Sequence, residues 1–115
     1  MTKLEAKKER YLRDPIPIRL GGLAANLARV KSFSTNPANG DAVYGLFDES
    51  KYFIEWLAAE TDIDTASALA GFQLQIALWQ LNWNQRWDDE NTRAEMARAS
   101  AEWSQKILER SGLLG

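Results

Sequence analysis

Carboxylates are the residues of this sequence whose type and spacing come closest to a chemical site. Asp62 and Asp64 form one cluster, and Asp88, Asp89 and Glu90 form another. Such clusters can hold a hard cation or perform general acid–base chemistry. Both, however, precede segments with helical periodicity, where acidic side chains accept bonds from free amides and complement the helix dipole. We therefore predict that they cap helices, and we expect no metal site and no cofactor.

Histidine and cysteine are both absent from the 115 residues. Without imidazole there is no Ser-His-Asp triad, no common zinc site and no Glu-x-x-His di-iron motif. Without thiols there is no disulfide, thiolate metal site or cysteine nucleophile. Ser, Thr, Lys and Tyr nucleophiles stay possible, but none has a recognisable activating context. We predict a protein without catalytic residues, and a small enzyme that uses carboxylates is the alternative.

Positive charge is concentrated in the first third of the chain. Residues 1–31 carry eight basic residues against three acidic ones, although the whole chain has a net charge of −2. The candidate anion-binding residues are Arg10, Arg13, Arg19, Arg29 and Lys31. They could bind nucleic acid or an anionic membrane surface, but no nucleic-acid-binding motif accompanies them. The interpretation that we prefer is that the basic third docks on the acidic remainder of the chain.

Aromatic residues offer a second kind of binding surface, because the chain has five tryptophans. Tryptophan suits both a core and a surface that binds another protein. We expect most of the five in the core, with Trp87, beside the acidic turn, as the clearest exception. Tyr52 and Trp56 stand off the apolar stripe of their helix, although the amino-terminal segment could cover them. The predicted partner-binding residues are Tyr52, Trp56, Trp83 and Trp87.

Helical periodicity predicts the elements that position these residues. A marginal helix over 2–13 ends at Asp14-Pro15-Ile16-Pro17, since residues before proline favour extended backbone. Further helices are predicted over 18–34, 41–59, 64–87 and from 92 to about 111. Asp41, Asp62 or Asp64, and a capping box at Thr92 and Glu95 are the predicted starts, and Gly112 is the predicted left-handed stop.

The predicted helix over 64–87 has apolar residues on two sides. Leu69, Phe72, Ile76, Trp79 and Trp83 share one side, and Leu74, Leu78 and Leu81 share the nearly opposite one. A helix that is apolar on two sides must be covered on two sides. We therefore place it at the centre of the fold or across an oligomer interface.

Together these patterns predict an all-α, up-and-down bundle of four to five helices with helix 64–87 central. The chain reads as one domain over 1–115, with 1–17 as a loosely packed arm. We expect a cytoplasmic address, because the sequence contains neither a signal-peptide pattern nor a membrane-spanning run. The expected function is a protein–protein interaction module that binds a protein partner or a second copy of itself.

Three segments carry a resemblance to known sequences. They are DPIPIRLGGLAANLARVKSFS (14–34), ESKYFIEW (49–56) and WSQKILERSGLLG (103–115). They resemble a group of short, uncharacterised cyanobacterial proteins, and the resemblance spans most of the chain. It implies an intracellular protein of a photosynthetic bacterium, and it implies no activity, cofactor or catalytic residue.

Overall fold

The structure is a computed structural model that describes residues 1–113, which form α-helices and one short 3-10 turn. In chain order the elements are α1 (Lys3–Arg13), α2 (Ile16–Phe33), η1 (Pro37–Asn39), α3 (Gly40–Ala58), α4 (Ile63–Gln80), α5 (Trp83–Asp88) and α6 (Glu90–Ser111). No strand occurs among the described residues. The predicted all-α helical bundle is confirmed.

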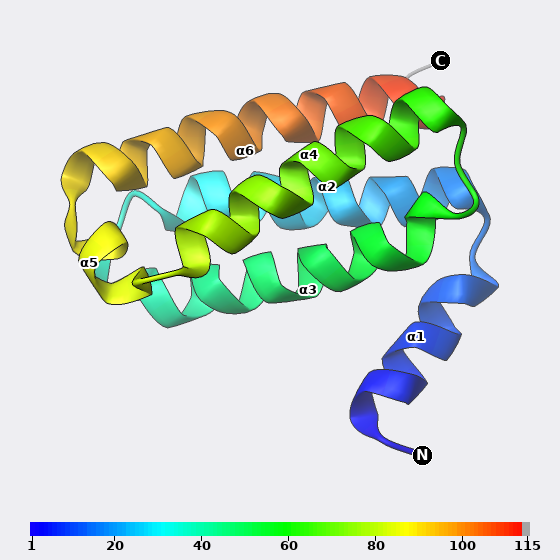
Figure 1. The fold of residues 1–115 in the computed structure, drawn as a ribbon, viewed down its shortest axis with the longest axis horizontal. Coiled ribbons are helices and arrows are strands. Elements are labelled where there is room, and N and C mark those ends of the chain that lie inside the picture. Colours follow the sequence, from blue (N-terminus) through cyan, green and yellow to red (C-terminus); the bar gives the residue numbers. More distant parts are fainter. Residues whose placement is uncertain (114–115) are drawn as a thin grey trace.

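The four long helices alternate in direction along the chain (Figure 1). α2 packs along both α6 and α3, and α4 crosses in front of α2 and rests mainly on α3. α5 is a short link between α4 and α6, whereas α1 projects from one end of the bundle (Figure 1). None of the residues of α1 is fully buried, so this helix lies against the bundle as an arm.

Each long helix contributes an apolar stripe to one shared core. The stripe predicted for α2 is buried along its whole length, because its residues recur at helical spacing and so face the same side. The α2 residues in the core are Leu20, Leu23, Ala24, Leu27 and Val30. The largest fully buried side chains that the other helices contribute are Phe47, Ile54 and Leu57 of α3, Leu69 and Ile76 of α4, and Met96 and Ile107 of α6.

Local hydrogen bonds explain where the helices start and stop. Asp62 caps α4 by accepting from the backbone amide of Thr65 at 3.2 Å, and Gly112 ends α6 with a φ of 80°, both as predicted. The predicted start at Asp41 is wrong by one residue, because the 3-10 turn runs directly into α3 at Gly40. The capping box at Thr92 is also wrong.

α6 begins earlier than predicted because another residue supplies the cap. The side chain of Asp89 accepts from the backbone amide of Asn91 at 3.2 Å and from the hydroxyl of Thr92 at 2.7 Å. Thr92 therefore lies inside the first turn of α6. Its hydroxyl donates to the carboxylate of the N-cap residue Asp89, and Thr92 is not itself the N-cap.

Residues 64–87 do not form one continuous helix, contrary to the prediction. α4 ends at Gln80, Asn82 adopts a left-handed φ of 54°, and α5 begins at Trp83. Asparagine tolerates this conformation better than most residues do, because its short side chain can bond locally. The turn redirects the chain so that the indole N–H of Trp87 donates to the carbonyl of Pro37 at 2.7 Å.

The central position predicted for helix 64–87 belongs to α2, and α4 lies at the rim. Leu74, Leu78 and Leu81 are 63, 43 and 61 % exposed. The other long helices already cover the opposite side of α4. No further long helix is left to cover this row, since α5 has six residues and α1 lies against α3. Four long helices thus close the core and leave one apolar row outside it.

Gly40 is required where α3 meets α5. A Cβ added at Gly40 would lie 2.8 Å from Nε1 of Trp87, the same atom that bonds Pro37. Gly45 lies further along α3, and a Cβ there would meet nothing within 4 Å. Gly45 therefore serves as the control: it lies inside α3, whereas Gly40 opens the helix, and only at Gly40 would an added Cβ meet another side chain.

We predict that Gly40→Ala lowers the free energy of unfolding by about 1–3 kcal/mol, because the bulky indole must shift. Gly45→Ala should raise it by about 0.5–1 kcal/mol, since alanine loses less backbone entropy in a helix. Urea denaturation of both variants measures these changes. Equal stabilisation by the two substitutions would show that Trp87 does not pack on Gly40.

Candidate functional site

The structure divides the predicted aromatic set into two groups. Trp56 and Trp87 are buried, at 9 and 5 % exposure, and belong to the core. Tyr52 and Trp83 are partly buried and pack against the edge of that core. The four residues therefore do not form one exposed aromatic patch.

Trp87 lies in the core, contrary to the prediction that it would be the exception among the tryptophans. Its ring stacks on Trp83 with centroids 5.5 Å apart, and the guanidinium carbon of Arg93 lies 5.7 Å from its centroid. Because its N–H donates to Pro37, its one polar atom is also satisfied. The left-handed turn at Asn82 makes this packing possible.

Trp56 is covered by the amino-terminal helix, the alternative that the sequence left open. Tyr11 of α1 stacks on Phe53 with centroids 4.0 Å apart and lies 5.9 Å from the ring of Trp56. The Tyr11 hydroxyl donates to the carbonyl of Arg19 at 2.7 Å, and burial raises the pKa of this phenol. Tyr52 also stacks on Trp56, with centroids 5.7 Å apart, and keeps part of its surface exposed.

An exposed surface with large apolar side chains lies on α4 and continues to Leu81, directly after its end. We call Leu74, Leu78 and Leu81 the leucine row. The same face continues toward the start of α4 through Ser67, Ala70 and Gly71, which are also exposed. No charged residue occurs between positions 65 and 85. A row of large apolar side chains on an uncharged helix face is a feature of surfaces that bind other proteins.

An open groove of about 460 Å³ runs between α3 and α4 beside the leucine row. Tyr52 forms part of its wall, and the amide of Gln73 donates to the carbonyl of Lys51 across it at 3.1 Å. The α3 side carries charged residues, whereas the α4 side carries small and apolar ones. The lining residues are Asp48, Lys51, Tyr52, Glu55, Ala70, Gln73, Leu74 and Ala77.

Tyr44 and Trp83 lie toward the other end of the leucine row. The edge of one ring meets the face of the other, with centroids 5.4 Å apart, and Tyr44 is exposed. The carboxamide of Gln80 points to the carbonyl of Tyr44 at 3.5 Å. Of the predicted partner-binding residues, Tyr52 thus lines the groove beside Leu74, whereas Trp83 packs on Tyr44, Phe47 and Trp87.

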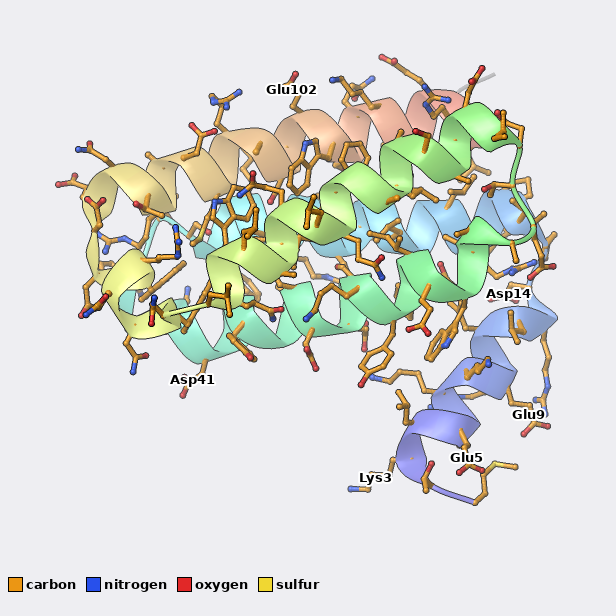
Figure 2. All side chains as sticks on the ribbon, viewed as in Figure 1. Lys3, Glu5, Glu9, Asp14, Asp41 and Glu102 are labelled. Atoms are coloured by element: carbon orange, nitrogen blue, oxygen red, sulfur yellow. The ribbon has the colours of Figure 1, made fainter. Side chains whose placement is uncertain are left out.

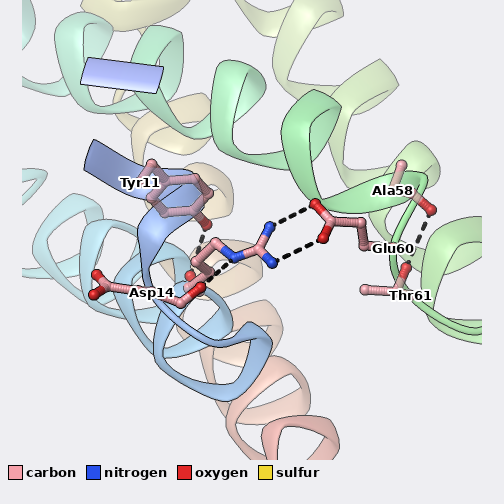
Figure 3. Close-up of polar contacts among 6 residues, drawn as sticks. Tyr11, Asp14, Ala58, Glu60 and Thr61 are labelled. Carbon is pink, nitrogen blue, oxygen red and sulfur yellow. Dashed lines mark hydrogen bonds and ion pairs between the residues drawn. The ribbon is translucent and has the colours of Figure 1, made fainter. Parts of the chain in front are cut away.

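The predicted anion-binding residues are dispersed, and Arg19 is occupied inside the fold. Its guanidinium donates to both carboxylate oxygens of Glu60, at 2.8 and 3.1 Å, and to the carbonyl of Asp14 at 2.9 Å (Figure 3). Arg19 is 4 % exposed, so little of it can reach an external phosphate. These hydrogen bonds lower the pKa of Glu60.

The other predicted basic residues lie on the surface. Arg13 pairs with Glu9 one turn away on α1, and Arg29 donates to the side chain of Asn26 at 3.2 Å. Arg10 and Lys31 are exposed, on α1 and α2 respectively. Anion binding through these four residues stays a prediction.

A second polar link between the basic third and α3 escaped the sequence reasoning. Lys7 of α1 and the carboxamide of Asn26 on α2 both donate to Glu49. Burial acts to raise the pKa of Glu49, but the hydrogen bonds from Lys7 and Asn26 outweigh it, so the pKa is lowered. With the Arg19–Glu60 pair, this contact favours the interpretation that the basic third docks on the rest of the chain.

The carboxylate clusters do not converge on a ligand site. Asp62 and Asp89 accept backbone hydrogen bonds as helix caps. Labelled carboxylates such as Asp41, Glu5 and Glu9 stand apart on the surface (Figure 2). In the part of the chain that the structure describes, no three acidic residues are grouped so that they could hold a metal ion. Among the same residues, no helix has the length and apolar character that crossing a membrane requires.

The Glu49 contacts predict a loss of stability in acid. A carboxyl group with a lowered folded-state pKa stabilises the fold above its ordinary pKa of 4.5, and this contribution disappears as the pH falls through the folded value. We expect the free energy of unfolding, measured in urea, to decrease over that interval. Glu49→Gln and Lys7→Met should each make the decrease smaller, and an unchanged decrease in both variants would contradict the role of this pair.

Comparison with known proteins identifies no relative. The chain matches no protein-family model, no curated protein and no solved structure. The resemblance to short cyanobacterial proteins therefore stays a prediction. The function of this chain has to be inferred from its own surface.

Proposed function

We propose that this protein is a non-catalytic interaction module that binds a protein through the leucine row of α4. The observation that carries this proposal is the exposure of Leu74 and Leu78 on a helix face without charge, and of Leu81 directly after the end of that helix. Their apolar character is not needed to fill the core, since they lie outside it. Contact with another protein explains why three large apolar residues occupy this position.

The surroundings of the leucine row support the same proposal. Tyr52 lines the groove beside Leu74 with a partly exposed ring, and aromatic residues are enriched where proteins bind each other. Charged residues such as Asp48 and Lys51 lie along the α3 edge of the groove, outside the apolar strip. An apolar centre with a polar margin is the usual anatomy of a protein–protein interface.

In-cell photo-crosslinking tests this proposal. The photoreactive amino acid p-benzoylphenylalanine replaces Leu78 in the full chain, which is produced in its native host and irradiated. We expect covalent adducts of discrete mass, to another protein or to the chain itself. The matched control carries the same probe at Ile18, an exposed apolar residue of α2. Adducts that are absent at position 78, or that are the same at both positions, would overturn the proposal.

A further inference from the structure

The exposed face of α4 has the spacing of a coiled-coil seam. Four exposed residues of α4, Ser67, Gly71, Leu74 and Leu78, and Leu81 directly after its end are separated by steps of four, three, four and three, with the exposed Ala70 beside them. This alternation averages 3.5 residues, the repeat by which one helix packs along another in a two-stranded coiled coil. The geometry therefore favours a helix as the occupant of this face.

Gly71 provides a second reason to expect a helix there. A Cβ added at Gly71 would meet nothing within 4 Å, so no contact inside the described chain requires a glycine. A glycine in the middle of a helix costs about 1 kcal/mol relative to alanine. With Ser67 and Ala70 beside it, Gly71 gives an external helix close access to the backbone of α4.

The charges on the two sides of α4 identify the occupant. The α3 rim, which consists of Asp48, Lys51 and Glu55, has a net charge of −1 and lines the groove beside Ala70 and Leu74. The α6 rim, which consists of Lys106, Glu109 and Arg110, has a net charge of +1 and lines a hollow beside Ala68 and Phe72. One molecule thus carries two rims of opposite net charge, one on each side of its uncharged seam.

A second copy of the same chain complements both rims at once. If two α4 helices pack in parallel about a two-fold axis along their seam, the α3 rim of each copy faces the α6 rim of the other. An antiparallel pair would instead place rims of like charge together. Glu55 makes no ion pair within the described residues, so its carboxylate is free to face the other copy. Lys106, which would lie opposite it, pairs with Glu102 of its own chain at 3.4 Å and would be shared between the two carboxylates.

We propose that the chain forms a two-fold homodimer in which α4 packs in parallel on α4 of a second copy. Each leucine row covers the other, and Glu55 of one copy faces Lys106 of its partner. This inference rests on the proposed function, because it names the protein that binds the leucine row. The seam from Ser67 to Leu81 is about 21 Å long at 1.5 Å per residue, which predicts a small interface and a dissociation constant on the order of micromolar.

Sedimentation velocity of the purified full chain, from about 1 to 500 µM, tests the dimer. We expect the wild type to shift from monomer to dimer over this range. Leu78→Glu should remain monomeric throughout, because it places two carboxylates in the seam. Ile18→Glu is the matched control, since Ile18 is also exposed but lies on α2, and it should dimerise like the wild type. Circular dichroism verifies that both variants keep their helices.

Charge reversal tests the parallel orientation at low ionic strength, where surface charges are least screened. Glu55→Lys and Lys106→Glu should each weaken the dimer about tenfold, because the two-fold axis repeats every unfavourable pair. The double variant should recover the affinity of the wild type. If both single variants and the double variant dimerise with the affinity of the wild type, the parallel pairing is overturned.

The two proposals fail in different ways. A wild-type chain that stays monomeric at 500 µM overturns the homodimer, as does a Leu78→Glu variant that still dimerises. If the chain is monomeric and the probe at position 78 nevertheless forms an adduct with a different protein in cells, the interaction module stands without the dimer. Absence of specific adducts overturns the interaction module itself.

Discussion

The contact between α2 and α6 is the interaction on which the bundle depends. Small buried residues occur on both helices: Ala24 on α2, and Ser100 and Ser104 on α6. Small side chains let the two helix backbones approach closely, and the Ser104 hydroxyl donates to the carbonyl of Ala24 at 2.8 Å. The apolar stripes of these two helices then form the surface on which α3 and α4 pack. In this way α2 and α6, two helices that are far apart in the sequence, pack against each other.

This arrangement explains why the bundle buries only one of the two apolar sides of α4. Leu69, Ile76 and Trp79 complete the core, which four long helices are enough to close. The leucine row therefore has no part in the packing of the single chain. Apolar residues that the fold does not need are informative about function, because water favours their burial against something else. Gly71 is informative for the same reason. A Cβ at this position would meet nothing within 4 Å among the described residues, so the packing of the single chain does not explain why the residue is a glycine.

Electrostatics inside the fold account for much of the charge asymmetry along the sequence. Lys7 pairs with Glu49 of α3, and Arg19 pairs with Glu60 just beyond the end of α3. Arg19 also bonds the carbonyl of Asp14, so it orders the turn between α1 and α2 while it holds the connection to α4. Two basic residues of a segment that could bind an external anion are thus already paired with carboxylates of the same chain. Opposite charges that are distant in sequence can meet only once the helices are packed.

The sequence alone determined the features that depend on short-range forces: the helical class, the buried stripe of α2, the cap at Asp62, the stop at Gly112 and the two apolar rows of 69–83. Periodicity and hydrogen bonds over a few residues set these features. Tertiary structure decided which row was covered, because that depends on how many helices remain to pack. It also decided that Trp56 and Trp87 are buried. Trp87 bonds Pro37, and Trp56 packs under Tyr11, through contacts between distant segments that no local pattern reveals.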